Sequence, residues 1–355
     1  MDTLTHAISG AVLGRAVQGT RLAPPAHAAA IGFLAAAFPD SDVVLQWLVD
    51  PLTFINLHRG LTHSLLMAPV WAVFIAATCA LLFGTRGAQR VRWRAAWPLV
   101  VMALLLHIAA DVITSYGTQI FAPLSAFKAS YPATFIIDVW FTGLLLAGLV
   151  FSLLRRSPLP ACIALVMLAG YVGLQAVLMA QARNFGVHHA RSMGLDDANV
   201  TALAQPLSPF NWRVVIEHAD EYHVTQVNLR RSEPLPVDDE AGFLRRVAAE
   251  YRPVHLAKWH RLLRFGEAPQ AQWVREAWQQ PAFESFRRFA RLPVLQEIEQ
   301  APPGRCAWFA DLRFTAGPVD APLRTPFRYG ICREGDGPWQ VFREGKEGPE
   351  PLTRR

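Results

Sequence analysis

A run of nineteen residues at positions 65–83 contains no charged side chain and reads LLMAPVWAVFIAATCALLF. As a helix it would nearly cross the hydrocarbon core of a bilayer, which requires about 20 residues. Apolar runs at 95–110, 139–154 and 159–180 predict three further transmembrane helices. Two shorter apolar segments, 3–17 and 26–38, cannot span the bilayer at about 1.5 Å per residue, so we expect them to form a partly inserted hairpin. A secretory signal peptide is the alternative interpretation of the start, although Asp2 and His6 stand where basic residues would be expected.

Ionisable residues are distributed unevenly along the chain. Residues 1–182 contain ten Lys and Arg, six Asp and no Glu, whereas residues 183–355 contain 24 Lys and Arg and 22 Asp and Glu. The first composition is typical of a membrane protein and the second of a soluble one. We therefore expect an α-helical membrane domain of four to six helices at 1–182, followed by a soluble α+β domain at 183–355.

Alternating residues in the second domain predict a two-stranded hairpin at 212–218 and 221–229, and further strands at 306–314, 326–333 and 339–343. Residues 239–251 and 271–299 are predicted to be helical. A hairpin that pairs Ala307 with Ile331 and Arg313 with Thr325 would place Cys306 opposite Cys332. A disulfide between these cysteines is a hypothesis consistent with an oxidising compartment. The other two cysteines, Cys79 and Cys162, fall in apolar runs and are expected to be packing residues.

The arginines indicate how the membrane domain is oriented. They form three clusters between the apolar runs: Arg15 and Arg21; Arg86, Arg90, Arg92 and Arg94; and Arg155 and Arg156. If the helices alternate in direction, the three clusters share one face, which the positive-inside bias makes cytoplasmic. The opposite, periplasmic face of this multi-pass protein would then hold the start of the second domain.

Histidines and aspartates lie beside the apolar runs, where unpaired ionisable groups are costly. A divalent metal ion would let several of them stay deprotonated together. His107 and Asp111 are four residues apart and would share one helix face, while Gly60 permits a tight turn in the 58–63 segment. Pro39 is expected to end a helix and leave two aspartates on a short extended or turn segment. The predicted metal ligands are His6, Asp40, Asp42, His58, His63, His107 and Asp111.

Each of these segments has a simpler explanation when taken alone. The 107/111 residues could be a polar pair inside a helix bundle, the histidines could be interfacial residues, and the two aspartates could form a turn or a helix cap. Their joint occurrence at one predicted face favours a metal site. Mixed imidazole and carboxylate ligands suit zinc best, with manganese or iron as alternatives, and we expect one to three ions.

Hydroxyl groups near the predicted ligands could orient them or bind a substrate oxygen. These residues are Thr62, Ser64, Thr114 and Ser115. Asp138 could belong to the same group or could cap the helix that follows it. His27 is excluded because it falls on the opposite predicted face.

The N-terminal half resembles the bacterial inner-membrane YdjM family of metal-dependent hydrolases. The shared pattern, within residues 1–140, consists of Thr5-His6 with Gly10, Pro39-Asp40-x-Asp42, His58-Arg59-Gly60-x-Thr62-His63-Ser64, and His107-x-x-x-Asp111 followed by Thr114-Ser115-Tyr116-Gly117-Thr118. The resemblance implies a membrane-bound hydrolase with a metal centre, distantly similar to zinc-dependent phospholipases C.

In such an enzyme a metal-activated water would attack a phosphorus or carbonyl centre. Asp40 or Asp42 would accept a proton from this water, and Arg59 would clamp a phosphate. The expected substrate is a phosphoester such as a phospholipid or a lipid-linked phosphate. The alternative is a metal-binding membrane protein without catalysis, such as a transporter or a regulatory scaffold.

The formal net charge of +6 raises the question of nucleic-acid binding. The second domain has only a small excess of cations, and no basic stripe with interleaved aromatic residues is apparent. We therefore expect membrane lipid headgroups, not nucleic acid, as the anionic partner.

Overall fold

The computed structural model describes residues 1–20, 27–83, 91–238, 240–301, 304–317, 319, 325–345 and 348–352. The chain divides into two compact units. Unit 1 comprises residues 1–44, 57–177 and 206–209, and unit 2 comprises residues 45–56, 178–205 and 210–355. The division falls within helix α7, Leu159–Ser192, which also contains the sequence-based boundary after residue 182.

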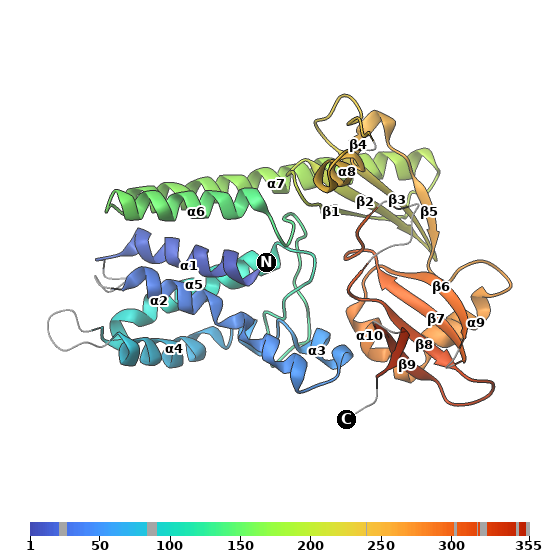
Figure 1. Ribbon diagram of the computed structural model, residues 1–355, viewed down its shortest axis with the longest axis horizontal. Coiled ribbons are helices and arrows are strands. Elements are labelled where there is room, and N and C mark those ends of the chain that lie inside the picture. Colours follow the sequence, from blue (N-terminus) through green and yellow to red (C-terminus); the bar gives the residue numbers. More distant parts are fainter. Residues whose placement is uncertain are drawn as a thin grey trace. The chain divides into compact units, whose positions relative to one another are not determined.

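Unit 1 is built from helices (Figure 1). They are α1 (Thr3–Val17), α2 (Ala28–Ala37), α4 (Ala68–Leu82), α5 (Trp93–Val112), α6 (Val139–Leu154) and the first part of α7, with the short 3₁₀ helices η1 (Pro39–Trp47, which runs on into unit 2) and η2 (Leu61–His63). Each predicted apolar segment is therefore helical over most of its length, although residues 65–67 form a turn before α4 and residue 26 lies outside the described residues. The aspartates after Pro39 were expected on an extended or turn segment, and that expectation was wrong: they belong to a 3₁₀ helix.

Two described helices, α5 and α7, are long and apolar enough to cross a membrane on their own. Two bent pairs could each serve as one further span: α2 with η1, and the segment 51–63 with α4. Helix α6 is apolar but has only 16 residues, or about 24 Å. The described helices thus provide two to four candidate spans, and the predicted runs at 65–83 and 139–154 do not form full-length spans by themselves.

Helices α1 and α2 pack backbone against backbone because both are rich in small residues. A Cβ atom added at Gly10 would lie 2.0 Å from the carbonyl oxygen of Gly32, and one at Gly14 would lie 2.1 Å from that of Ala28. Small residues allow this close approach between helices in apolar surroundings. The packing fixes the start of α1 beside the end of α2.

The described arginines of the three clusters lie at one end of the helices. Arg15 is in the last turn of α1, where its guanidinium donates to the hydroxyl and carbonyl oxygens of Ser152 near the end of α6. Arg92 directly precedes α5, and Arg155 and Arg156 follow α6. Arg21, Arg86 and Arg90 lie outside the described residues.

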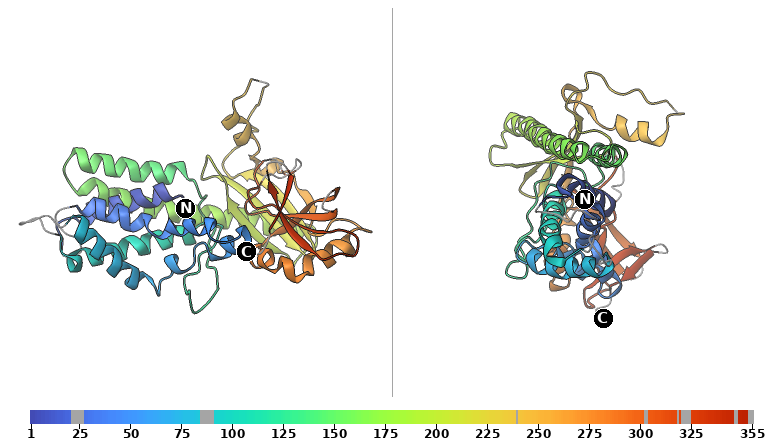
Figure 2. Two further views of the ribbon diagram at one scale, coloured as in Figure 1. Left: turned by 60° about the horizontal axis from the view of Figure 1, so that its bottom comes forward. Right: turned by 90° about the vertical axis from the view of Figure 1, so that its left-hand side faces the viewer.

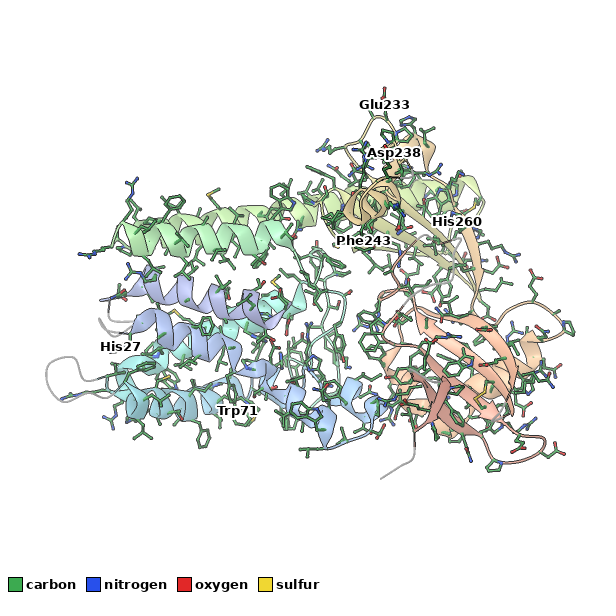
Figure 3. The ribbon with its side chains drawn as sticks, in the orientation of Figure 1. His27, Trp71, Glu233, Asp238, Phe243 and His260 are labelled. Atoms are coloured by element: carbon green, nitrogen blue, oxygen red, sulfur yellow. A yellow bond between two sulfur atoms is a disulfide. The ribbon has the colours of Figure 1, made fainter. Side chains whose placement is uncertain are left out.

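His27 lies at the start of α2, at this same arginine-bearing end (Figure 3). Its ring stacks on Phe83 after α4, with 5.0 Å between centroids. The ten residues of α2 separate it from the aspartates that follow the helix, by about 15 Å. Its exclusion from the predicted metal site agrees with this position.

Unit 2 contains two five-stranded sheets within its described residues. The first consists of β1 (Asn199–Ala204), β2 (Asn211–His218), β3 (Glu221–Asn228), β4 (Arg252–Pro253) and β5 (His260–Leu263), and the second of β6 (Pro293–Ala301), β7 (Gly304–Asp311), β8 (Tyr329–Arg333), β9 (Gln340–Gly345) and β10 (Gly348–Pro351). Its helices are α3 (Pro51–Leu57), η3 (Val254–Leu256), α8 (Phe243–Ala249), α9 (Ala271–Gln279), η4 (Pro281–Phe283) and α10 (Glu284–Phe289). The second sheet is an antiparallel meander.

The predicted hairpin at 212–229 is confirmed by the antiparallel pairing of β2 with β3. The helix predicted over 271–299 is wrong in its last third, because β6 occupies Pro293–Ala301 and pairs with β7. Ala307 pairs with Ile331 as predicted, although the ladder ends at Phe309 and Tyr329, before the predicted 313/325 pair. Cys306 and Cys332 face each other in this register and form a disulfide.

Candidate metal centre

Helix α5 contributes His107 and Asp111, which are fully buried on one face of the helix. His107 Nδ1 is 2.6 Å from the carbonyl oxygen of Ala36 and donates to it. This bond leaves Nε2 as the acceptor atom, 3.4 Å from Asp111 Oδ2. The end of α2 thus orients a histidine of α5.

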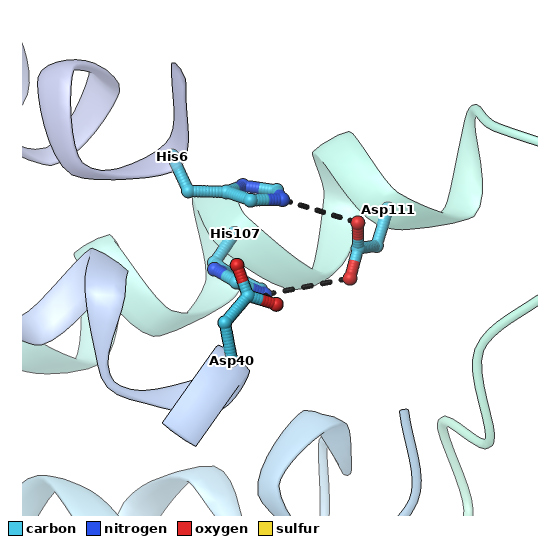
Figure 4. A group of neighbouring side chains, drawn as sticks. All are labelled: His6, Asp40, His107 and Asp111. Carbon is cyan, nitrogen blue, oxygen red and sulfur yellow. Dashed lines mark hydrogen bonds and ion pairs between the residues drawn. The ribbon is translucent and has the colours of Figure 1, made fainter. Parts of the chain in front are cut away.

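Helices α1 and η1 complete a group of four side chains (Figure 4). His6 of α1 places Nε2 3.1 Å from Asp111 Oδ1, and its ring stacks on His107 with 3.7 Å between centroids. Asp40 of η1 places Oδ1 3.7 Å from His107 Nε2. One ligand atom from each of His6, Asp40, His107 and Asp111 lies within 4.8 Å of the others, and all four residues are buried.

His63 of η2 adjoins this group. Its Nε2 atom lies 3.2 Å from Asp111 Oδ2 and 3.5 Å from Asp40 Oδ1. Five nitrogen and oxygen donors from α1, η1, η2 and α5 therefore converge. We call His6, Asp40, His63, His107 and Asp111 the buried cluster.

Five atoms of the buried cluster have no hydrogen-bond partner among the residues that the structure describes. These atoms are His6 Nδ1, Asp40 Oδ2, His63 Nε2, His107 Nε2 and Asp111 Oδ2. Buried polar atoms without a partner are rare because their desolvation is not compensated. Two carboxylates beside imidazole nitrogens match the donor set of zinc and related cations. The cluster could therefore bind a metal ion, and its residues fit one.

Asp42 and His58 lie beside the buried cluster as a pair. Asp42 Oδ1 is 2.8 Å from His58 Nδ1, and Asp42 Oδ2 accepts from the backbone N–H of Arg59 at 2.9 Å and from Thr62 Oγ1 at 3.3 Å. The Thr62 hydroxyl is also 2.9 Å from His63 Nδ1. Asp42 and Thr62 thus orient the histidines on either side of them.

Arg59 is buried, with a side chain 2% exposed. Its Nη2 lies 2.9 Å from Asp111 Oδ1, its Nη1 donates to Thr114 Oγ1 at 2.9 Å, and its guanidinium carbon lies 5.1 Å from the centre of the Tyr116 ring. The left-handed backbone of the predicted turn belongs to Arg59, with φ of 60°, and not to Gly60. The arginine expected to clamp a phosphate is therefore paired inside the protein.

The other predicted residues serve mainly to hold the structure. Ser64 donates to the carbonyl oxygen of Ala122 at 2.5 Å and accepts from the N–H of Leu66, while Thr114 joins the end of α5 to Arg59. Ser115 is half-buried in the turn that follows. Asp138 caps α6 by accepting from the N–H groups of residues 140 and 141, and it also accepts from Tyr171 and Gln175. Of the two interpretations of Asp138, the helix cap is the one the contacts support.

Tyr116 belongs to the shared pattern that follows Asp111, whereas sequence reasoning did not assign a role to Lys128. The Tyr116 ring contacts His58, with 5.3 Å between ring centroids, and Lys128 Nζ lies 5.4 Å from its centre. The sequence did contain a feature that could have drawn attention to Lys128, because it is the single lysine among residues 1–182.

Comparison with protein families matches residues 1–182 to the family described as YdjM inner membrane protein. A relative among curated proteins is the uncharacterized protein YfhP of Bacillus subtilis (strain 168). It is 26% identical over 231 residues, which cover 63% of this chain and 67% of the relative. No solved structure matches the chain.

Proposed function

This chain belongs to the YdjM family of inner membrane proteins, and we propose that it is a membrane-bound, metal-dependent hydrolase. The observation that carries the proposal is the buried cluster, in which histidine nitrogens and aspartate oxygens lie 3.1–3.7 Å apart. A polar pair of a helix bundle would satisfy its own hydrogen bonds. Here five buried donor or acceptor atoms have no hydrogen-bond partner in the described part of the chain.

The residues that would hold the cation are His6, Asp40, His63, His107 and Asp111. A bound divalent cation supplies Lewis acidity and activates water for hydrolysis. Three imidazoles with two carboxylates favour zinc, and manganese or iron would accept the same donors. The Arg59 guanidinium balances part of the negative charge of Asp111.

The chain's own residues also suggest a route for a proton. Within the described residues Asp40 Oδ2 has no hydrogen-bond partner, so it could accept a proton from an attacking water. His58 has the most exposed side chain among the predicted ligands, at 21%, and Asp42 holds its Nδ1. The Asp42 and His58 pair would pass the proton toward solvent.

We propose a phosphoester of a membrane lipid as the substrate class. A site bounded by apolar helices favours a substrate that is already in the bilayer, and a metal centre suits an anionic phosphoryl oxygen. The first domain, residues 1–182, would supply this chemistry.

We further propose that the buried cluster and unit 2 face the periplasm. The described arginines lie at the other end of the helices, which the positive-inside bias places in the cytoplasm. The disulfide between Cys306 and Cys332 suits an oxidising compartment.

Metal analysis of purified full-length protein tests the proposal. We expect the wild type to retain a stoichiometric divalent metal, and His63→Ala and Asp111→Asn to lose it. Asp138→Asn is the matched control, because Asp138 is buried and asparagine can still cap α6. Equal metal content in all four proteins would refute the metal site. Metal binding without hydrolysis of phosphodiester or lipid phosphate substrates would refute the hydrolase and favour a non-catalytic metal-binding protein.

A further inference from the structure

The chain after α5 forms a short hairpin whose outer surface is apolar. Thr118 and Ala129 exchange both backbone hydrogen bonds, each at 2.9 Å, and close the hairpin at its base. At its tip Phe121, Leu124 and Phe127 are 44%, 83% and 59% exposed. Three large apolar side chains this exposed in twelve residues would be unfavourable in water. The hairpin 118–129 therefore needs an apolar environment.

Backbone hydrogen bonds attach this hairpin to the candidate metal centre. The N–H of Gln119 donates to the carbonyl oxygen of Arg59 at 2.9 Å, and the N–H of Leu65 donates to that of Ile120 at 3.0 Å. The Ser64 hydroxyl donates to the carbonyl oxygen of Ala122. Because these bonds hold the base against the segment 59–65, the apolar tip has a fixed position relative to His63.

The direction of the hairpin matches a bilayer interface. Figure 2 (left) shows the loop that follows α5 projecting sideways from the helices of unit 1, at the end of α5 that carries Asp111. If the helices cross the membrane, a segment that leaves their ends sideways lies along the membrane surface. Phe121, Leu124 and Phe127 would then contact lipid.

Lys128 adds a positive charge next to this apolar tip. Its Nζ lies 5.4 Å from the centre of the Tyr116 ring, which also contacts His58 and Arg59. Arg59 is paired with Asp111 within the protein, so it is not the cation that faces lipid. A lysine at the membrane surface attracts anionic headgroups.

We propose that the hairpin 118–129 is a phospholipid-binding element. Its three apolar tip residues insert among acyl chains at the interface, and Lys128 contacts the phosphate of a lipid beside His58 and the buried cluster. In this position the hairpin would bring a lipid phosphate to the metal centre. This role in presenting substrate rests on the proposed function. Lipid insertion itself does not depend on catalysis.

Spin-label accessibility in vesicles of phosphatidylethanolamine and phosphatidylglycerol tests the insertion. The full chain carries Cys79→Ala and Cys162→Ser, and one cysteine is introduced at Leu124, Val166 or Ser232. Val166 of α7 is 73% exposed and serves as the lipid reference, and Ser232, exposed in unit 2, serves as the water reference. We expect the spin label at position 124 to have a collision rate with oxygen similar to that of the label at position 166. Collision with a water-soluble nickel complex at the level of the label at 232 would overturn the proposal.

Hydrolysis assays test the presentation of substrate. Leu124→Asp is expected to lower the hydrolysis of vesicle phospholipid about tenfold, because it removes the burial of one leucine side chain. Lys128→Met is expected to lower it about fivefold. Leu124→Asp should leave metal content and the hydrolysis of a short, water-soluble phosphodiester unchanged, because its side chain is proposed to contact acyl chains only. Lys128→Met should leave metal content unchanged. The control is Leu154→Asp, a change at a side chain that is 74% exposed at the arginine-bearing end of α6, and it should leave metal content and the hydrolysis of both substrates unchanged. Equal loss on both substrates in Leu124→Asp would refute the presenting role, whereas a wild type inactive on both would refute the hydrolase and leave the spin-label result to decide lipid insertion.

Discussion

Two aspartates two residues apart, Asp40 and Asp42, have different surroundings. Asp40 Oδ2 has no hydrogen-bond partner among the described residues, whereas both oxygens of Asp42 accept hydrogen bonds from the 58–62 segment. A carboxylate whose oxygens are already used orients its neighbours and is less available to a cation. The two aspartates of the short 3₁₀ helix η1 therefore have different roles. Asp40 belongs to the buried cluster, and Asp42 holds the 58–62 segment beside it.

We predict that Asp42→Asn lowers metal affinity about 10–100-fold and leaves the stoichiometry unchanged, since Asp42 acts through His58 and Thr62. Asp40→Asn should abolish stoichiometric binding, because Asp40 is a member of the cluster. Competition with a chelator of known affinity measures both. Complete loss of metal in Asp42→Asn would make Asp42 a ligand, as the sequence alone suggested.

The identities of the cluster residues could be predicted from sequence, but several of their roles could not. His107 and Asp111 share a helix face by spacing alone, and a histidine beside apolar sequence indicates a partner. The role of Arg59 depends on which groups the fold brings to it, and no local pattern encodes its pairing with Asp111. The same holds for Tyr116, whose contacts come from the distant 58–59 segment.

At the scale of elements, the close packing of α1 on α2 positions His6 and Asp40. We predict that Gly10→Ala destabilises the protein by about 1–3 kcal/mol or more, because the new Cβ would lie 2.0 Å from a backbone oxygen. Metal content should fall with it. Gly143→Ala in α6 is the control, since its Cβ would meet no atom within 4 Å, and it should be neutral or stabilising by up to about 1 kcal/mol. Denaturant unfolding in detergent measures both, and equal effects would contradict the packing argument.

Helices and strands with an uninterrupted pattern of apolar residues could be predicted from the sequence. Those in which this pattern is interrupted could not. The 139–154 run matches the bounds of α6 because a capping aspartate precedes it and arginines follow it. Strand β6 was mistaken for helix because a register shift between Leu295 and Glu297 disrupts its alternation. Helix α7 continues past residue 180 because a change to polar composition ends an apolar run without ending a helix. The composition of a segment indicates its surroundings, whereas backbone hydrogen bonding determines where a helix begins and ends.

At the scale of the whole molecule, each of the two units has its own hydrophobic core. A change that destabilises one unit is therefore expected to leave the other folded. The disulfide joins cysteines 26 residues apart in unit 2, and its loss should destabilise that unit by about 3 kcal/mol. We predict that Cys306→Ser with Cys332→Ser increases proteolysis of the C-terminal region on heating, with no change in metal content. Cys162→Ser, a change at an exposed free cysteine of α7, should have no effect. Loss of metal in the double variant would show that the units are coupled.

The orientation that we propose for the molecule in the membrane rests on the distribution of its charges, and it can be measured in intact cells. Arg156, just after α6, belongs to the cationic end, and Ser232 is exposed in unit 2. Since positively charged segments remain in the cytoplasm, a membrane-impermeant maleimide should label Ser232→Cys in intact cells and Arg156→Cys after lysis only. Cys162→Ser in both proteins removes the exposed native thiol. The reverse labelling pattern would place the buried cluster on the cytoplasmic side, where glutathione and thioredoxin keep thiols reduced, so the two cysteines of unit 2 would then be expected as free thiols.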